Sequence, residues 1–233
     1  MCKHVLLLLL LPLFLLSCSS NTPSEKANDK VSTRMDSSTI VWPIPQPSPD
    51  YDTSQWVDIL DLDSTILLDM RYATNNNFVK EQLYDCGRCF LRPEVGQAVR
   101  TAHRALQQQG LGLKLFDCFR PRPIQQKLWE KVPNPNYVTP PKKGSMHNRG
   151  MAVDVTIVKA NGEELDMGTG FDYFGQEAHH TYTELPDAVL DNRQLLKETM
   201  AAVGLRPIRT EWWHYSYSAA SHELSDMLWK CED

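Results

Sequence analysis

The segment from Glu94 to Gln109 has its apolar residues at the spacing of an amphipathic helix. Pro93 precedes the segment and Gly110 follows it, as is typical of the first and last positions around a helix. The apolar positions recur every three or four residues, which places them on one face, and they are Val95, Ala98, Val99, Ala102, Ala105 and Leu106. This pattern predicts a helix with one buried face.

Other segments alternate with the period of two that is typical of a strand. Residues 111–116 place leucines at alternate positions, and residues 211–217 are rich in the aromatic side chains that favour strands. In residues 151–157 the positions Val153, Val155 and Ile157 share one face, so that Asp154 lies on the opposite face. We therefore expect Asp154 to lie away from the apolar core.

Two further helices complete the predicted elements. One is expected over about residues 122–131, and Asp191 is predicted to be the N-cap of another, which ends before Gly204. Helices and strands alternate without a regular βαβ repeat, which favours an α+β fold over a doubly wound parallel sheet.

The first 17 residues have the features of an export signal. Lys3 precedes an apolar run from Val5 to Leu16, which is too short for a membrane-spanning helix. The run ends in Leu-Leu-Ser-Cys at residues 15–18, which resembles a bacterial lipobox; the alternative is an ordinary signal with a chance cysteine. We expect a signal peptide at 1–17, a polar and proline-rich tether at 18–50 and a folded domain at 51–233. The protein would then be exported and anchored to the bacterial cell envelope by a lipid on Cys18, facing the periplasm or lying on the outer membrane.

Charge and cysteine content narrow the possible partners. The 24 basic and 29 acidic residues give a formal net charge of −5, which argues against nucleic acid as a partner. No protein partner is indicated. Four cysteines belong to the predicted domain, namely Cys86, Cys89, Cys118 and Cys231, and they allow three pairings. Cys86 and Cys89 have zinc-knuckle spacing but lack a second close pair, so structural disulfides in an oxidising compartment are the better interpretation.

Histidine and acidic residues occur in two segments that could together bind a metal ion. His147 lies in a loop with Gly150, Asp154 lies on the following strand, and Glu211 and His214 lie near the C-terminus. Two imidazoles and one carboxylate would leave a tetrahedral Zn²⁺ with an open position for water, as catalytic zinc requires. A further carboxylate that is not a ligand could act as the base.

The motifs Ser-x-His-x-x-Gly-x-Ala-x-Asp at 145–154 and Glu-Trp-Trp-His-Tyr at 211–215 resemble those of the D-alanyl-D-alanine dipeptidases, a family of zinc D,D-peptidases. Segments 70–78, 117–121 and 167–180 resemble family segments in the same order, so the resemblance covers about residues 57–217. It implies a small, mostly antiparallel sheet that carries one zinc ion and packs against several helices. It also implies His147, Asp154 and His214 as zinc ligands, Glu211 as general base and acid, and Arg120 as the cation that stabilises the tetrahedral intermediate.

The same resemblance implies residues that bind the two ends of the substrate. Ser145 would bind the carboxylate of the dipeptide, and Asp172 and Tyr72 would lie near its ammonium group. The adjacent His179 and His180 are expected to have a structural or supporting role, because neighbouring residues rarely point at one ion.

The sequence departs from the family pattern at Cys118, where glycine is usual. We expect Cys118 to form a disulfide with Cys86 or Cys89 and so to fix the strand end that carries Arg120. A second difficulty is that Glu211 and His214 are three residues apart, so a regular strand would point them to opposite faces. A bulge or a sharp twist would resolve this.

The predicted function is zinc-dependent hydrolysis of a small D,D-dipeptide by metal-activated water. One alternative is a D,D-carboxypeptidase that trims peptidoglycan stem peptides, although the Trp212-Trp213 pair favours the dipeptidase. Another is a zinc-stabilised lipoprotein that binds cell-wall peptides without cleaving them. Glu211 and Arg120 argue against the binding protein, because binding alone needs no base.

Overall fold

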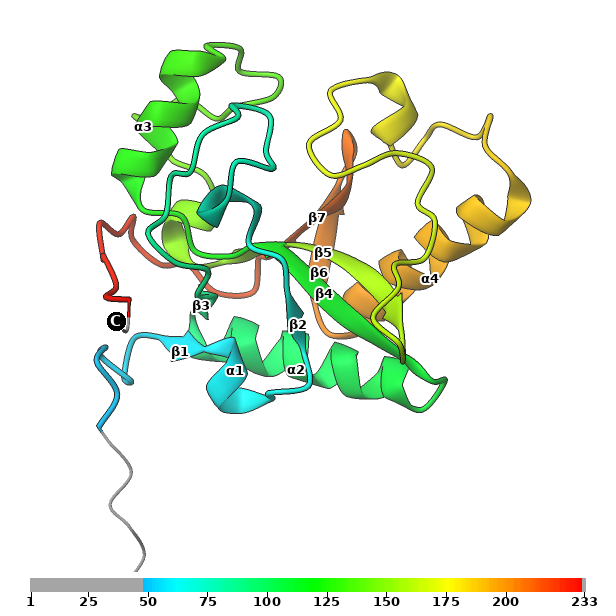
Figure 1. The fold of residues 1–233 in the computed structure, drawn as a ribbon, viewed down its shortest axis with the longest axis horizontal. Helices are drawn as coiled ribbons and strands as arrows, with labels where there is room; N and C mark the ends of the chain where they lie inside the picture. The colour runs from blue at the N-terminus through cyan, green and yellow to red at the C-terminus, as the bar shows by residue number, and fades with distance from the viewer. Residues whose placement is uncertain (1–47, 232–233) are drawn as a thin grey trace, which may run out of the picture. The chain divides into compact units, whose positions relative to one another are not determined.

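The computed structural model of the protein describes residues 48–231 (Figure 1). The predicted signal peptide, the lipid anchor at Cys18 and nearly all of the predicted tether lie outside the described residues. Within residues 48–231, no helix is both long enough and apolar enough to cross a membrane.

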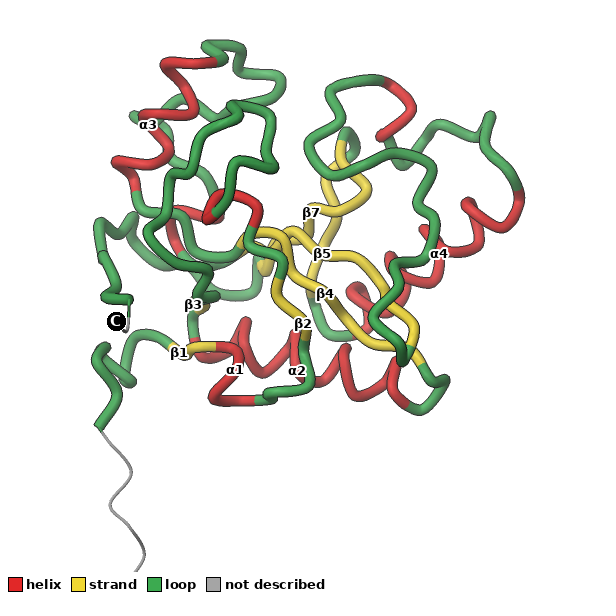
Figure 2. The backbone as a smooth tube through the Cα atoms, in the orientation of Figure 1, coloured by secondary structure: helices red, strands yellow, loops and turns green. Residues whose placement is uncertain are grey.

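A five-stranded sheet in the order β2-β4-β5-β7-β6 forms the centre of the fold (Figure 2). The β2–β4 pair is parallel and the other three pairs are antiparallel, so the predicted mostly antiparallel sheet is confirmed. A separate two-stranded antiparallel sheet is formed by β1 and β3. The strands are β1 Val57–Asp58, β2 Leu67–Leu68, β3 Phe90–Leu91, β4 Leu111–Asp117, β5 Ala152–Lys159, β6 Leu205–Ile208 and β7 Glu211–Tyr217.

Two long helices cover one face of the central sheet, while α3 and several long loops lie on the other side (Figure 1). The α-helices are α1 Ile59–Leu62, α2 Pro93–Gln107, α3 Arg122–Lys131 and α4 Asp187–Ala202. Short 3₁₀ helices occur at η2 Arg71–Ala73, η3 His147–Arg149 and η4 Gln176–Ala178. The structure confirms the helix predicted at residues 94–109 as α2, although α2 ends two residues earlier than predicted. It also confirms the helix predicted at about residues 122–131 as α3.

The predicted start of α4 is wrong. Asp191 lies inside the helix, which begins at Asp187 directly after Pro186. Proline fixes a backbone angle suited to a helix start, and the Asp187 carboxylate in the first turn interacts favourably with the helix dipole. These two signals outweigh the capping tendency of Asp191.

The two faces of β5 have different roles. Val153, Val155 and Ile157 are completely buried, and they belong to the core cluster that includes the apolar faces of α2 and α4. Burying one such side chain stabilises the folded state by about 1.5–3 kcal/mol relative to leaving it exposed to water. Asp154 lies on the opposite face, as expected, but it is also buried, because loops cover this face as well.

Two disulfides tie the loops to this framework. Cys118 pairs with Cys89, which is one of the two predicted alternatives, and Cys86 pairs with Cys231. Residues 218–231 contain no helix or strand, and they run back along the body of the protein to reach Cys86. The Trp229 ring in this segment packs against Tyr84 and Phe90, so the disulfide ends a packed segment.

Candidate active site

Three neighbouring strands place acidic and histidine side chains side by side. In the register of the sheet, Asp117 on β4 lies opposite Asp154 on β5, and Asp154 lies opposite His214 on β7. The β4–β5 pairing is irregular between Leu115 and Asp117, where two steps on β4 match one on β5. This bulge brings Asp117 into line with Asp154.

A second irregularity resolves the spacing of Glu211 and His214. Pro207 on β6 pairs with Tyr215, whereas the next residue, Ile208, pairs with Glu211. One step along β6 therefore corresponds to four along β7, which is a large bulge in β7. As a result, Glu211 and His214 both line the same cavity, and the expected departure from a regular strand is confirmed.

His147 is positioned by a tight turn and by a backbone carbonyl. Gly150 ends the turn with φ of +70°, and a Cβ atom there would lie 2.4 Å from the Trp56 ring, so both its conformation and its surroundings require glycine. The Nδ1 atom of His147 lies 2.6 Å from the carbonyl oxygen of Cys118. Because a carbonyl only accepts, Nδ1 carries a proton and the lone pair of Nε2 points the other way.

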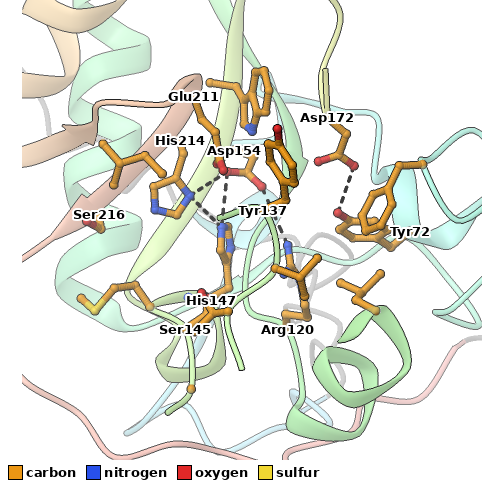
Figure 3. Close-up of a pocket in the computed structure, with 18 of the residues that line it drawn as sticks. Tyr72, Arg120, Tyr137, Ser145, His147, Asp154, Asp172, Glu211, His214 and Ser216 are labelled. Atoms are coloured by element: carbon orange, nitrogen blue, oxygen red, sulfur yellow. Dashed lines mark hydrogen bonds and ion pairs between the residues drawn. The ribbon is translucent and has the colours of Figure 1, made fainter. Parts of the chain in front are cut away.

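The predicted metal ligands converge (Figure 3). His147 Nε2 lies 3.1 Å from His214 Nδ1 and 3.3 Å from Asp154 Oδ1, and His214 Nδ1 lies 3.0 Å from the same Asp154 oxygen. Ligand atoms around a tetrahedral zinc ion are about 3.3 Å apart, so the set has the dimensions of one face of such a site. One proton on His214 Nδ1 can satisfy only one of its two acceptor neighbours. A divalent cation therefore fits this donor set better than hydrogen bonding alone.

The charges of this cluster also favour a cation. Burial alone would raise the pKa of the Asp154 carboxyl, but the adjacent His147 and His214 outweigh burial and hold that pKa well below its ordinary value. Asp154 is therefore an anion, which is the form in which a carboxyl group binds a metal.

Glu211 lies in the same cavity as the three candidate ligands. Burial, together with the charges of Asp154 and Asp172, raises the pKa of the Glu211 carboxyl to about 7. A carboxyl group with this pKa can both accept and donate a proton near neutral pH, as a general base and acid must.

Arg120 is held in place by buried partners. Its Nε and Nη2 atoms donate to Asp117 Oδ2 at 2.9 and 2.6 Å, and its Nη1 donates to Gln125 Oε1 at 3.0 Å. Three of its five N–H groups are thus engaged, which leaves one on each terminal nitrogen. Nη2 lies 4.0 Å from Asp154 Oδ2, and Arg120 lines the cavity. The guanidinium is therefore fixed with donors still free for a ligand.

The sequence reasoning gave no role to Asp117, which is fully buried and anchors Arg120. Its Oδ1 atom also accepts a hydrogen bond from the Tyr84 hydroxyl at 3.0 Å. The only signal in the sequence was an aspartate three residues before a candidate catalytic arginine, and that spacing alone does not show that the two side chains meet.

The residues predicted to bind the ends of the substrate lie in different parts of the cavity (Figure 3). The Tyr72 hydroxyl donates to Asp172 Oδ2 at 3.0 Å. Burial, and then the charge of Asp154, raise the pKa of Asp172 to about 8. On the other side, Ser145 Oγ accepts the backbone N–H of His147 at 3.0 Å.

All eight predicted site residues line one cavity of about 530 Å³. The cavity also has aromatic and aliphatic walls that the sequence reasoning missed, including Phe78, Tyr137 and Phe174. These residues lie in loops, where side chains follow no periodic pattern that would indicate where they point.

His179 and His180 do not line this cavity. The backbone N–H of His180 donates to the Arg209 carbonyl, and the carbonyl of His179 accepts from Arg193. Burial lowers the pKa of His180 to about 4, so this side chain is neutral at physiological pH. Both contacts agree with the expected structural role.

The chain is similar in sequence to two D-alanyl-D-alanine dipeptidases. The D-alanyl-D-alanine dipeptidase of Escherichia coli is 34% identical over 181 residues, which cover 77% of this chain and 94% of the relative. The D-alanyl-D-alanine dipeptidase of Enterococcus faecalis is 29% identical over 171 residues, which cover 63% and 83%. A solved structure of the LdcB LD-carboxypeptidase aligns with a TM-score of 0.44 at 16% identity, over 72% of this chain and 70% of that chain. The family model described as D-ala-D-ala dipeptidase, in peptidase family M15, matches residues 52–229, and the chain therefore belongs to this family.

Proposed function

We propose that this protein is a zinc-dependent dipeptidase that hydrolyses D-alanyl-D-alanine to free D-alanine, with one zinc ion per chain. The observation that carries the proposal is the convergence of His147, Asp154 and His214 beside Glu211 in one cavity. The relatives named above act on the same dipeptide, according to their names.

The residues of the cavity have the chemistry that peptide hydrolysis needs. His147, Asp154 and His214 would hold the zinc ion, which supplies Lewis-acid chemistry by lowering the pKa of water and polarising a carbonyl group. Glu211 accepts the proton of the attacking water and delivers it to the leaving amine. The two free N–H groups of Arg120 stabilise the negative charge that develops on the carbonyl oxygen.

Side chains at two places in the cavity fit the two ends of a dipeptide. Asp172, held by Tyr72, would pair with the substrate ammonium group, whose positive charge favours the ionised form of this carboxyl. Ser145 would bind the substrate carboxylate. Binding both ends would place the peptide bond between them, near Glu211 and the metal ligands.

The test uses purified full-length protein loaded with zinc. We expect release of D-alanine from D-alanyl-D-alanine, no release of alanine from L-alanyl-L-alanine, and loss of activity in the Glu211→Gln variant with its zinc content unchanged. A stem pentapeptide cleaved in preference to the dipeptide would indicate a D,D-carboxypeptidase instead. A protein that binds one zinc ion and these peptides but cleaves none of them would be a binding protein.

We also propose that the protein is exported and anchored to the cell envelope by a lipid on Cys18. The apolar run that ends at Cys18 supports this, and the Cys89–Cys118 and Cys86–Cys231 disulfides suit an oxidising compartment. Metabolic labelling with a palmitate analogue is expected to mark the wild type and not a Cys18→Ala variant. Equal labelling of the two proteins would refute the anchor.

A further inference from the structure

Three aromatic side chains from separate loops meet at the cavity and form a cluster that we call the aromatic bridge: Phe78, Tyr137 and Phe174. The Tyr137 and Phe174 rings are stacked, with centroids 4.6 Å apart and an interplanar angle of 25°. Phe78 contacts the Phe174 ring edge-on at 5.0 Å. All three residues line the cavity.

The aromatic bridge joins three segments that are far apart in the sequence. Phe78 follows η2, Tyr137 lies between α3 and η3, and Phe174 lies between β5 and η4. In Figure 1 the α3 side and the η4 side stand apart above the sheet. The stack between Tyr137 and Phe174 therefore links two separate groups of loops next to the site.

These rings are more exposed than the fully buried core, and of the three only Phe78 packs against a core cluster, the one that contains Tyr72. Tyr137 is 41% exposed, and Phe78 and Phe174 are half-buried, whereas Trp212 and Trp213 on β7 are almost completely buried. Large aromatic side chains at the surface that also line a substrate cavity are better explained by contact with a ligand than by core packing.

The aromatic bridge adjoins the part of the cavity that holds Asp172. Phe174 is two residues from Asp172, whose φ of +58° is a left-handed conformation that a non-glycine residue adopts at a cost. The ring of Phe78 also contacts Tyr72, which is the hydrogen-bond partner of Asp172. The backbone of this turn thus presents an acidic and an aromatic side chain to the same cavity.

We propose that the aromatic bridge determines substrate length by closing the amino-terminal end of the cavity. This inference rests on the proposed function, in which Asp172 pairs with the ammonium group of the dipeptide. A residue attached to that nitrogen would remove the positive charge, and it would have to occupy the space taken by Phe78 and Phe174. The bridge therefore excludes peptides that are extended at their amino end, and these include the stem peptides of the carboxypeptidase alternative.

The test compares two substrates, D-alanyl-D-alanine and L-lysyl-D-alanyl-D-alanine, by the D-alanine that full-length zinc-loaded protein releases. We expect Phe174→Ala and Tyr137→Ala to raise the ratio of kcat/KM for the tripeptide to that for the dipeptide at least tenfold. Tyr137→Phe retains the stacked ring and should keep the wild-type ratio. Tyr173→Ala removes an aromatic ring from the same loop, but this ring is 45% exposed and does not line the cavity, so the ratio should not change.

The outcomes separate this inference from the proposed function. Wild-type protein that cleaves the tripeptide as well as the dipeptide, or alanine variants that are folded by circular dichroism but keep the wild-type ratio, would overturn the aromatic bridge and leave the dipeptidase intact. Wild-type protein that releases no D-alanine from D-alanyl-D-alanine would refute the proposed function and the inference that rests on it.

Discussion

Replacing Asp117 with alanine tests the anchoring of Arg120 most directly. In the wild type, the Asp117 carboxylate is completely buried and accepts two hydrogen bonds from Arg120 and one from Tyr84. The Asp117→Ala variant would leave a buried guanidinium without its main counter-charge and a buried hydroxyl without its acceptor. Removing one partner of a buried ion pair costs about 3–5 kcal/mol. The free energy of unfolding of a folded domain is about 5–15 kcal/mol, so this loss is a large part of it.

The same substitution is expected to reduce activity through Arg120. Without Asp117, the guanidinium keeps only Gln125 as a hydrogen-bond partner. Its nearest opposite charge is then Asp154, whose Oδ2 atom lies 4.0 Å from Nη2 in the wild type. We expect Arg120 to move toward Asp154 and away from the position in which it is proposed to stabilise the developing oxyanion. Loss of one such donor typically lowers kcat by about 10²–10³-fold. Asp117→Asn keeps an acceptor oxygen but not the charge. Its losses of stability and of kcat should lie between those of the wild type and Asp117→Ala.

Urea unfolding followed by tryptophan fluorescence measures the stability, and D-alanine release measures kcat. Asp69→Ala is the matched control, because Asp69 also pairs with an arginine, Arg71, but its side chain is 34% exposed. Exposed pairs contribute about 0–1 kcal/mol, so this control should remain close to wild type. If Asp117→Ala is as stable as Asp69→Ala, or if its kcat is unchanged, the anchoring of Arg120 by Asp117 is refuted.

Three further predictions concern the metal, the proposed base and the Cys86–Cys231 disulfide. Zinc at a hundred times its Kd should raise the free energy of unfolding by about 2.7 kcal/mol, and a His147→Ala variant should not respond; an equal response would place the ion elsewhere. In metal-free protein, the Glu211 carboxyl should be protonated at pH 6 and ionised at pH 8, because its pKa is about 7; a carboxyl band at pH 6 in the infrared difference spectrum against Glu211→Gln checks this, and its absence would contradict the raised pKa. Replacing Cys86 and Cys231 together with alanine should lower the free energy of unfolding by about 2–5 kcal/mol, since the disulfide closes a long loop; unchanged urea unfolding would show that the packing of residues 218–231 alone holds this segment.

Elements with a strong local pattern could be predicted from the sequence. The helix now seen as α2 and the strand β5 repeat their apolar residues at one period over several turns or pleats, and this period depends only on local geometry. The start of α4 could not be predicted in the same way. Pro186 and Asp191 are both helix-start signals, and their relative strength depends on where the chain enters the helix.

The candidate site could be predicted where residue type and spacing limit the chemistry, as they do for His147 and Asp154. The anchor of Arg120 and the aromatic bridge could not be predicted, because they depend on contacts between residues that are not linked by any local period. Tyr84 meets Asp117 from 33 positions away, and Phe174 meets Tyr137 from 37 positions away. Such contacts follow from the packing of loops, which a single sequence does not reveal.

Within the segment 117–120, Cys118 has two separate roles. The Cys118 carbonyl fixes the proton of His147, while the Cys118 side chain pairs with Cys89, so one residue serves the site with its backbone and the framework with its sulfur. The backbone N–H of Arg120 donates to the His147 carbonyl at 3.1 Å, which binds the two segments together. Asp117 and Arg120 lie at the two ends of the segment 117–120. A shift of the strand end would therefore move the candidate metal ligand His147 and Arg120 together, and the Cys89–Cys118 disulfide restrains this shift.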